Sequence, residues 1–163
     1  LSGIEVDVME DGSLDLADET LSKLDIVLCS VHTKFNLPRK EQTARVIKAI
    51  SHPAVNILSH PTTRVINERE PIDIDLEKIF QTAKEKQVAI EINAHPSRLD
   101  INDRQAKEAK NRGVKIAIST DAHRAEELHN LRYGIYQARR GWLEPADVIN
   151  TWKLEDLLKF LNK

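Results

Sequence analysis

Short runs of apolar residues recur along the chain and alternate with segments that have the apolar spacing of helices. The runs are rich in Val and Ile, which is typical of β-strands. Nearly continuous apolar strands that alternate with helices indicate a parallel sheet covered by helices, so the pattern predicts an α/β fold. The expected strands are Gly3–Val8, Asp25–Val31, Val55–Ser59, Val88–Asn93 and Val114–Thr120.

Three segments between these runs have apolar residues on one helical face and boundary residues at their ends. They are Pro38–Ser51, Asp75–Gln87 with Asp75 as its N-cap, and Ile101–Arg112, which stops at Gly113. Beyond the last strand the pattern predicts a helical C-terminal tail over Ala125–Arg139, Pro145–Asn150 and Leu154–Leu161. No repeat or linker divides the chain, so residues 1–163 are expected to form a single domain.

Composition limits the classes of function. The net charge of −2 provides no overall basic field for nucleic acid, so any DNA contact must be local. Cys29 is the only cysteine, which excludes an internal disulfide and favours a reducing, cytoplasmic location. No apolar stretch approaches the roughly 18 residues of a membrane span, and no G-x-G-x-x-G follows a strand. A membrane protein and a dinucleotide-binding domain are therefore not expected.

Side chains that can bind a metal ion lie in the first predicted strand or directly after the later ones. Since parallel strands share one carboxyl edge, these residues are expected to meet there. Imidazoles and carboxylates form a ligand set for Zn, Mn or Fe, and a carboxylate can bridge two ions. Arg64 and Arg98 come after two of the ligand-bearing loops and are candidates for binding phosphate. The candidate ligands are Glu5 in the first run and His32, His60, His95, Asp121 and His123 after the later runs.

Each of these residues also has an ordinary structural explanation. A single His at a strand end is usually a hydrogen-bonded loop residue, and Asp121 could cap the following helix. His95 fits a loop role and a phosphate-binding role equally well, and Arg64 and Arg98 could instead form surface salt bridges. A common edge for all the residues favours the metal site, because the separate explanations do not predict it. Outside the site, His52 and His129 are expected to be a helix-end and a solvent-exposed residue, and Trp142 and Trp152 to be packing residues.

Seven segments, taken in order, resemble the PHP (polymerase and histidinol phosphatase) domain. The resemblance covers essentially the whole chain and is greatest to the PHP domains at the C-terminus of bacterial family X DNA polymerases. The segments are GIEVDV, DGSLDL, LSKLDIVLCSVHTKF, NILSHPTTR, AIEINAHPSRLD, ISTDAH and LRYGIYQARRGWLEPADVINTWKLEDLLKFL.

This resemblance implies a distorted parallel (β/α)7 barrel that binds up to three divalent ions and hydrolyses phosphate esters. In polymerase-linked domains it implies Mn-dependent 3′–5′ exonuclease activity at DNA 3′ ends, with a polymerase domain in the same parent chain. Carried over by motif, Glu5 would bridge two ions, and His32 and His60 would complete one of their sites. Asp121 would join Glu5 on the other ion, and His123 would belong to the third. Glu5 and Asp121 are thus the expected catalytic carboxylates.

The sequence departs from the family pattern in two ways. No two histidines lie two positions apart, so the opening His-x-His of the family has no counterpart, and His95 stands where relatives usually have Asn. The chain therefore resembles the C-terminal two-thirds of the domain, with about five strands of the barrel and without its N-terminal strands. Such a piece is expected to expose strand edges, to self-associate through them, and to be inactive when alone.

Two other functions remain open from the sequence. The chain could belong to a stand-alone phosphatase that acts on a small phosphomonoester such as histidinol phosphate. It could also be a non-catalytic structural module of a polymerase.

Overall fold

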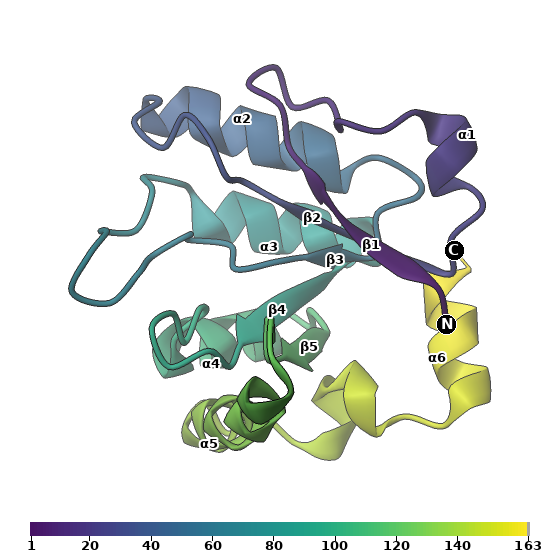
Figure 1. The fold of residues 1–163 in the computed structure, drawn as a ribbon, viewed down its shortest axis with the longest axis vertical. Helices are drawn as coiled ribbons and strands as arrows, with labels where there is room; N and C mark the ends of the chain where they lie inside the picture. The colour runs from purple at the N-terminus through teal and green to yellow at the C-terminus, as the bar shows by residue number, and fades with distance from the viewer. Residues whose placement is uncertain (163) are drawn as a thin grey trace.

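A parallel β-sheet forms the centre of the molecule (Figure 1). The computed structural model describes residues 1–162. Its five strands lie in chain order across the sheet, and each neighbouring pair is parallel. The predicted α/β class is confirmed, and the arrangement is that of part of a (β/α) barrel. The strands are β1 (Gly3–Asp7), β2 (Ile26–Ser30), β3 (Ile57–Leu58), β4 (Ala89–Asn93) and β5 (Ile116–Ser119).

Helices connect successive strands, and α2 lies beside α3 and α4 beside α5 (Figure 1). The α-helices are α1 (Asp18–Leu21), α2 (Arg39–Ile50), α3 (Leu76–Glu85), α4 (Asp103–Asn111), α5 (Leu131–Arg140) and α6 (Leu154–Leu161). Short 3-10 helices are η1 (Ala125–Asn130), η2 (Pro145–Asp147) and η3 (Ile149–Thr151). The Asp75 side chain caps α3 as predicted by accepting the Lys78 N–H, and Gly113 follows α4 with φ of 78°. Among residues 1–162 no helix combines the length and apolarity needed to cross a membrane.

Three local predictions needed correction. β3 has two residues rather than five, although Asn56 and Ser59 on either side of it still donate their backbone N–H groups to carbonyls of β2. The predicted helix from residue 125 begins as η1 and becomes α-helical only at Leu131. Trp142 is 66% exposed, with the Lys107 ammonium 3.8 Å from its ring centre, so it is not a packing residue.

The two faces of the sheet differ in chemistry. On one face, side chains such as Val27, Leu58 and Ile90 join the main core beneath the helices. On the other face, Ile57 belongs to a smaller apolar cluster that Trp152 and other residues of the C-terminal tail cover. Trp152 therefore packs as predicted, with its ring edge-on to another tail aromatic.

Towards the carboxyl ends of the strands, this second face becomes polar. The register pairs Glu5 with Leu28, and Leu28 with Ile57, which places Glu5 on the same face as the small apolar cluster. Glu91 lies on this face as well, because it alternates with Ile90 and pairs with Ala117. β1 and β5 are the edge strands of the described sheet. Self-association through these edges stays a prediction.

Candidate metal centre

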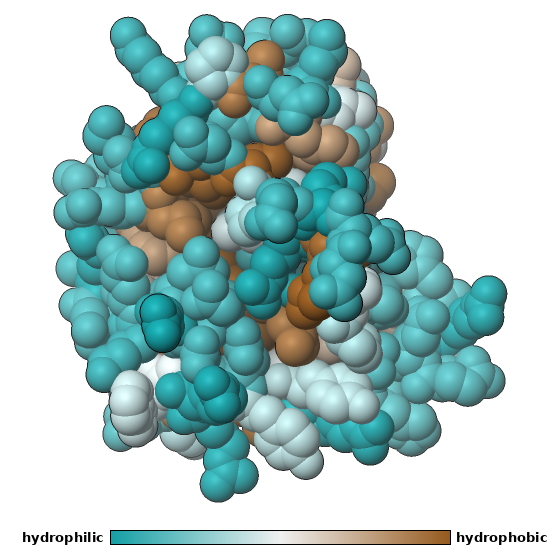
Figure 2. Space-filling view, turned by 90° about the vertical axis from the view of Figure 1, so that its left-hand side faces the viewer, coloured by the Kyte–Doolittle hydropathy of each residue, from teal (hydrophilic) through white to brown (hydrophobic). Residues whose placement is uncertain are grey.

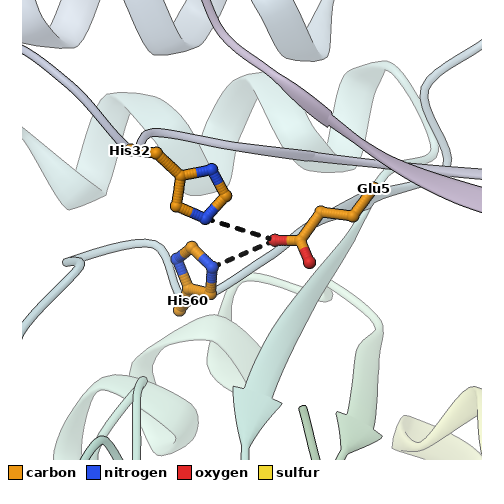
Figure 3. Close-up of side chains that lie close together, drawn as sticks. All are labelled: Glu5, His32 and His60. Carbon is orange, nitrogen blue, oxygen red and sulfur yellow. Dashed lines mark hydrogen bonds and ion pairs between the residues drawn. The ribbon is translucent and has the colours of Figure 1, made fainter. Parts of the chain in front are cut away.

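Glu5, His32 and His60 direct their polar atoms at one point (Figure 3). The His60 Nε2 lies 3.0 Å from Glu5 Oε1, and the His32 Nε2 lies 3.8 Å from the same oxygen. The two imidazole rings are tilted by 54°, with their centroids 5.1 Å apart. Among residues 1–162 this is the only group of three His, Cys, Asp or Glu side chains whose ligand atoms all lie within 4.8 Å of one another.

The sheet topology explains why these three residues meet. Glu5 lies in β1, and His32 and His60 follow the ends of β2 and β3. These three strands are neighbours and run parallel, so their carboxyl ends lie together. Residues that are 55 positions apart in the chain thus come within hydrogen-bond distance.

The donor set fits a first-row divalent ion. Ligands about 2.0–2.1 Å from a tetrahedral ion lie about 3.4 Å from one another. The distances of 3.0 and 3.8 Å from Glu5 Oε1 fall on either side of this value. Two imidazole nitrogens and one carboxylate suit Zn, Mn or Fe.

Asp7 supports His32 from the opposite side of the ring. Its Oδ1 forms a short hydrogen bond with the His32 Nδ1, which leaves Nε2 facing Glu5. A carboxylate on the second ring nitrogen is the usual support of a metal-binding His. The sequence analysis did not select Asp7. Its position two residues after Glu5 on the same strand face was the available signal.

The charges of the site are strongly coupled. The hydrogen bond with His60 is the main reason why the pKa of Glu5 is lowered to about 2, although burial opposes the change. Burial alone would lower the pKa of His60, but the hydrogen bond with Glu5 and the charge of Glu91 raise it overall. The surroundings of the Glu5–His60 pair thus favour a positive charge beside Glu5.

Asp121 and His123 belong to the other half of the same cavity. This cavity of about 360 Å³ is lined by both of them and by Glu5 and His60. Asp121 accepts a hydrogen bond from the Asn93 amide at 3.1 Å and lies 3.9 Å from the His123 Nδ1. His123 is largely exposed, and these two residues lie outside the three-residue ligand group.

The remaining candidates have different surroundings. The Arg98 Nε lies 3.4 Å from Asp121 Oδ2, and its buried Nη1 has no hydrogen-bond partner among residues 1–162. Arg64 donates instead to the backbone carbonyls of Arg98 and Leu99. The His95 Nδ1 lies 2.8 Å from the Ser97 hydroxyl. Of these three candidates, Arg98 is the one that forms an ion pair with a predicted site carboxylate, Asp121.

The cavity opens on the side of the molecule where the strands end. Figure 2 views this side, and hydrophilic residues dominate it around an apolar area in its upper half. The two histidines that were expected outside the site differ in surroundings: His52 pairs with Asp18 at 3.2 Å, and His129 is exposed in η1.

Comparison with known proteins gives relatives of two kinds. The chain is 37% identical over 163 residues to the Bacillus subtilis (strain 168) protein named DNA polymerase/3′-5′ exonuclease PolX, covering 100% of the chain and 29% of that protein. It is 34% identical over 171 residues to a probable phosphatase of Thermoanaerobacter sp. (strain X514), covering 98% of the chain and 67% of that protein. A probable phosphatase of Acetivibrio thermocellus is 34% identical over 136 residues, covering 78% of the chain and 54% of that protein. No protein-family model matches the chain.

The partial α/β barrel carries a cluster of two imidazoles and a carboxylate at its carboxyl edge, where active sites of such folds lie, and these three side chains could hold a metal ion. Together with these relatives, they show that the chain belongs to the PHP family. It spans less than a third of the B. subtilis protein and about two thirds of the Thermoanaerobacter phosphatase.

Proposed function

We propose that the chain is the catalytic part of a metal-dependent phosphoesterase. Glu5, His32 and His60 would hold one divalent ion, and Asp121 and His123 would contribute to further ion sites in the same cavity. The observation that carries the proposal is the convergence of the three ligand atoms within 4.8 Å of one another. Phosphatase and exonuclease relatives support the hydrolytic class.

A divalent ion in this site would supply Lewis acidity for a water molecule and for the phosphoryl oxygens. Residues of the chain would orient the ligands of the ion and bind the phosphate group. Asp7 holds the His32 ring by its Nδ1, so that the Nε2 remains available as a ligand. The Arg98 guanidinium, beside Asp121, would bind the non-bridging oxygens of the phosphate. Glu5 is ionised throughout the neutral pH range, since its pKa is about 2.

The favoured substrate is a phosphodiester at a DNA 3′ end, cleaved as part of a family X polymerase. The B. subtilis relative matches the whole chain and is named both a polymerase and an exonuclease. In this proposal a polymerase domain in the parent chain supplies most of the DNA affinity, because the net charge of −2 supplies little. N-terminal strands that carry a His-x-His pair would complete the barrel and the other ion sites.

A second candidate is the hydrolysis of a small phosphomonoester. The supporting observation is that the probable phosphatases share 34% identity with the chain over nearly its whole length. Arg98 would then bind the terminal phosphate itself.

Metal content gives the first test. Elemental analysis of the purified chain should find about one Zn, Mn or Fe per chain, and the ion should be lost from His60→Ala. His129→Ala is the matched control, because His129 is exposed and away from the site. A metal-free wild-type chain after reconstitution would contradict the proposed centre.

Substrate preference gives the second test. The metal-loaded chain is supplied with a 5′-end-labelled oligonucleotide and, separately, with histidinol phosphate. Shortening of the oligonucleotide supports the DNA proposal, and release of phosphate from the small ester supports the second candidate. A metal-loaded chain that is inactive on both, also when produced in its full-length parent, would contradict a catalytic role and leave the structural-module alternative.

A further inference from the structure

Glu91 is a buried carboxylate that joins two loops of the cavity. It lies in β4, between β3 and β5, and is 2% exposed. Its Oε2 accepts the backbone N–H of His60 at 2.6 Å, and its Oε1 accepts a short hydrogen bond from the Ser119 hydroxyl. His60 follows β3, and Ser119 ends β5 just before Asp121. One side chain thus contacts both segments that carry candidate ligands.

His60 lacks the usual support of a metal-binding imidazole. A ligand His normally donates its second ring nitrogen to a carboxylate or carbonyl, as His32 does to Asp7. The Nδ1 of His60 is buried and has no hydrogen-bond partner among residues 1–162. Its backbone also has a φ of 26°, in the left-handed region that a residue with a Cβ adopts at a cost. With no partner on Nδ1, the direction of the ring depends on its contact with Glu5 and on the position of its main chain.

We propose that Glu91 is a positioning residue of the metal centre. By accepting the His60 N–H and the Ser119 hydroxyl together, it holds the His60 backbone so that Nε2 faces Glu5, and it fixes the separation between His60 and the Asp121 segment. This inference rests on the proposed metal centre. Glu91 would thus orient His60 through its main chain, as Asp7 orients His32 through its ring.

A carboxylate suits this contact. Both groups donate to Glu91, and a carboxylate offers an acceptor oxygen to each. A glutamine could keep both contacts, because its oxygen can accept the His60 N–H and its NH₂ group can donate to the Ser119 hydroxyl. Glu91→Ala removes both acceptors and leaves the buried His60 N–H unpaired.

A Zn²⁺ titration of the metal-free chain by calorimetry tests the inference. Glu91→Ala should weaken Zn²⁺ binding by about ten- to a hundredfold, the usual loss for a residue that supports a ligand. Asp100→Ala is the matched control. Asp100 is also a fully buried carboxylate, and its side chain accepts the N–H and hydroxyl of Thr62 at 2.9 Å rather than a hydrogen bond from a candidate ligand. Asp100→Ala should lower the melting temperature of the metal-free chain about as much as Glu91→Ala, but change the Zn²⁺ affinity less than about threefold.

The absorption spectrum of the Co²⁺-loaded chain provides a second readout. At saturating Co²⁺, Glu91→Ala should shift the d–d bands, because His60 no longer holds its position, and Asp100→Ala should keep the wild-type spectrum. If Glu91→Ala does not fold, Ser119→Ala removes one partner only and should still alter the bands. Wild-type Zn²⁺ affinity and Co²⁺ spectrum in Glu91→Ala would overturn the inference and leave the metal centre intact. A wild-type chain that binds neither ion would overturn the proposed function itself, and the inference with it.

Discussion

Asp7 and His32 form a carboxylate–imidazole pair at the carboxyl ends of β1 and β2. The Asp7 Oδ1 binds the His32 Nδ1, and the opposite ring nitrogen lies 3.8 Å from Glu5 Oε1. Since Glu5 and Asp7 point to the same face of β1, one strand supplies both the candidate ligand and the group that orients its partner. This pair is specific enough to test separately from the ligands.

Asp7→Ala should weaken Zn²⁺ binding by about ten- to a hundredfold, because the ring of His32 loses the acceptor that sets its tautomer. The measurement is the dissociation constant by calorimetry. Asp18→Ala serves as control, since Asp18 pairs with His52 at 3.2 Å away from the site. Equal affinities in the two variants would show that Asp7 does not orient a ligand.

The metal-free chain should show a pH-dependent stabilisation from the Glu5–His60 pair. The lowered pKa of Glu5 gives stability that is complete above its ordinary value of 4.5 and is lost as the pH falls towards about 2. The raised pKa of His60 gives stability that is complete below its ordinary value of 6.5 and is lost as the pH rises through the folded value. With chelator present, the difference in melting temperature between wild type and Glu5→Gln should therefore be largest between about pH 4.5 and 6.5. A difference that keeps growing towards pH 9 would contradict this pairing.

Arg98 and Arg64 should have separable effects. Arg98→Met removes a cation beside Asp121 and should raise the KM for a phosphoester by about ten- to a hundredfold, as expected for the loss of a charged hydrogen bond. Arg64→Met removes bonds to two loop carbonyls and should mainly lower the melting temperature. Steady-state kinetics and thermal melts of both variants check this. If instead Arg64→Met raised the KM and Arg98→Met only lowered the melting temperature, Arg64 would be the phosphate ligand.

Gly134→Ala should destabilise the fold by about 1–3 kcal/mol, the usual cost of overpacking. A Cβ at this position would lie 2.5 Å from the Ile118 Cγ2 and 2.8 Å from the Ala94 Cβ, where α5 packs on β4 and β5. Urea unfolding measures the change. Gly113→Ala differs in cause, because its Cβ would meet only the flexible end of Lys84 at 3.4 Å and its cost comes from the φ of 78°. Unchanged stability in Gly134→Ala would mean that α5 shifts to make room for the methyl group at little cost in free energy.

The sequence predicted the parts of the fold that depend on local patterns. Runs rich in Val and Ile located the strands, and the helical spacing of apolar residues located α2 to α4. Asp75 and Gly113 marked helix boundaries correctly. The prediction was wrong for β3 and for the exposed Trp142, since both depend on tertiary neighbours. The residues on either side of β3 still bond to β2 without extending the strand, and Trp142 stays 66% exposed although the Lys107 side chain lies over its ring.

For the candidate site, the sequence by itself determined which residue types stand at the strand ends. The order of residues, and the alternation of side chains between the two faces of a strand, can be read from the chain alone. Only the tertiary structure decided which of them meet. Strand order placed β1, β2 and β3 side by side, so Glu5, His32 and His60 converge. The supporting roles of Asp7 and Glu91 also came from the structure, because a carboxylate gains such a role only from the donors that folding brings to it.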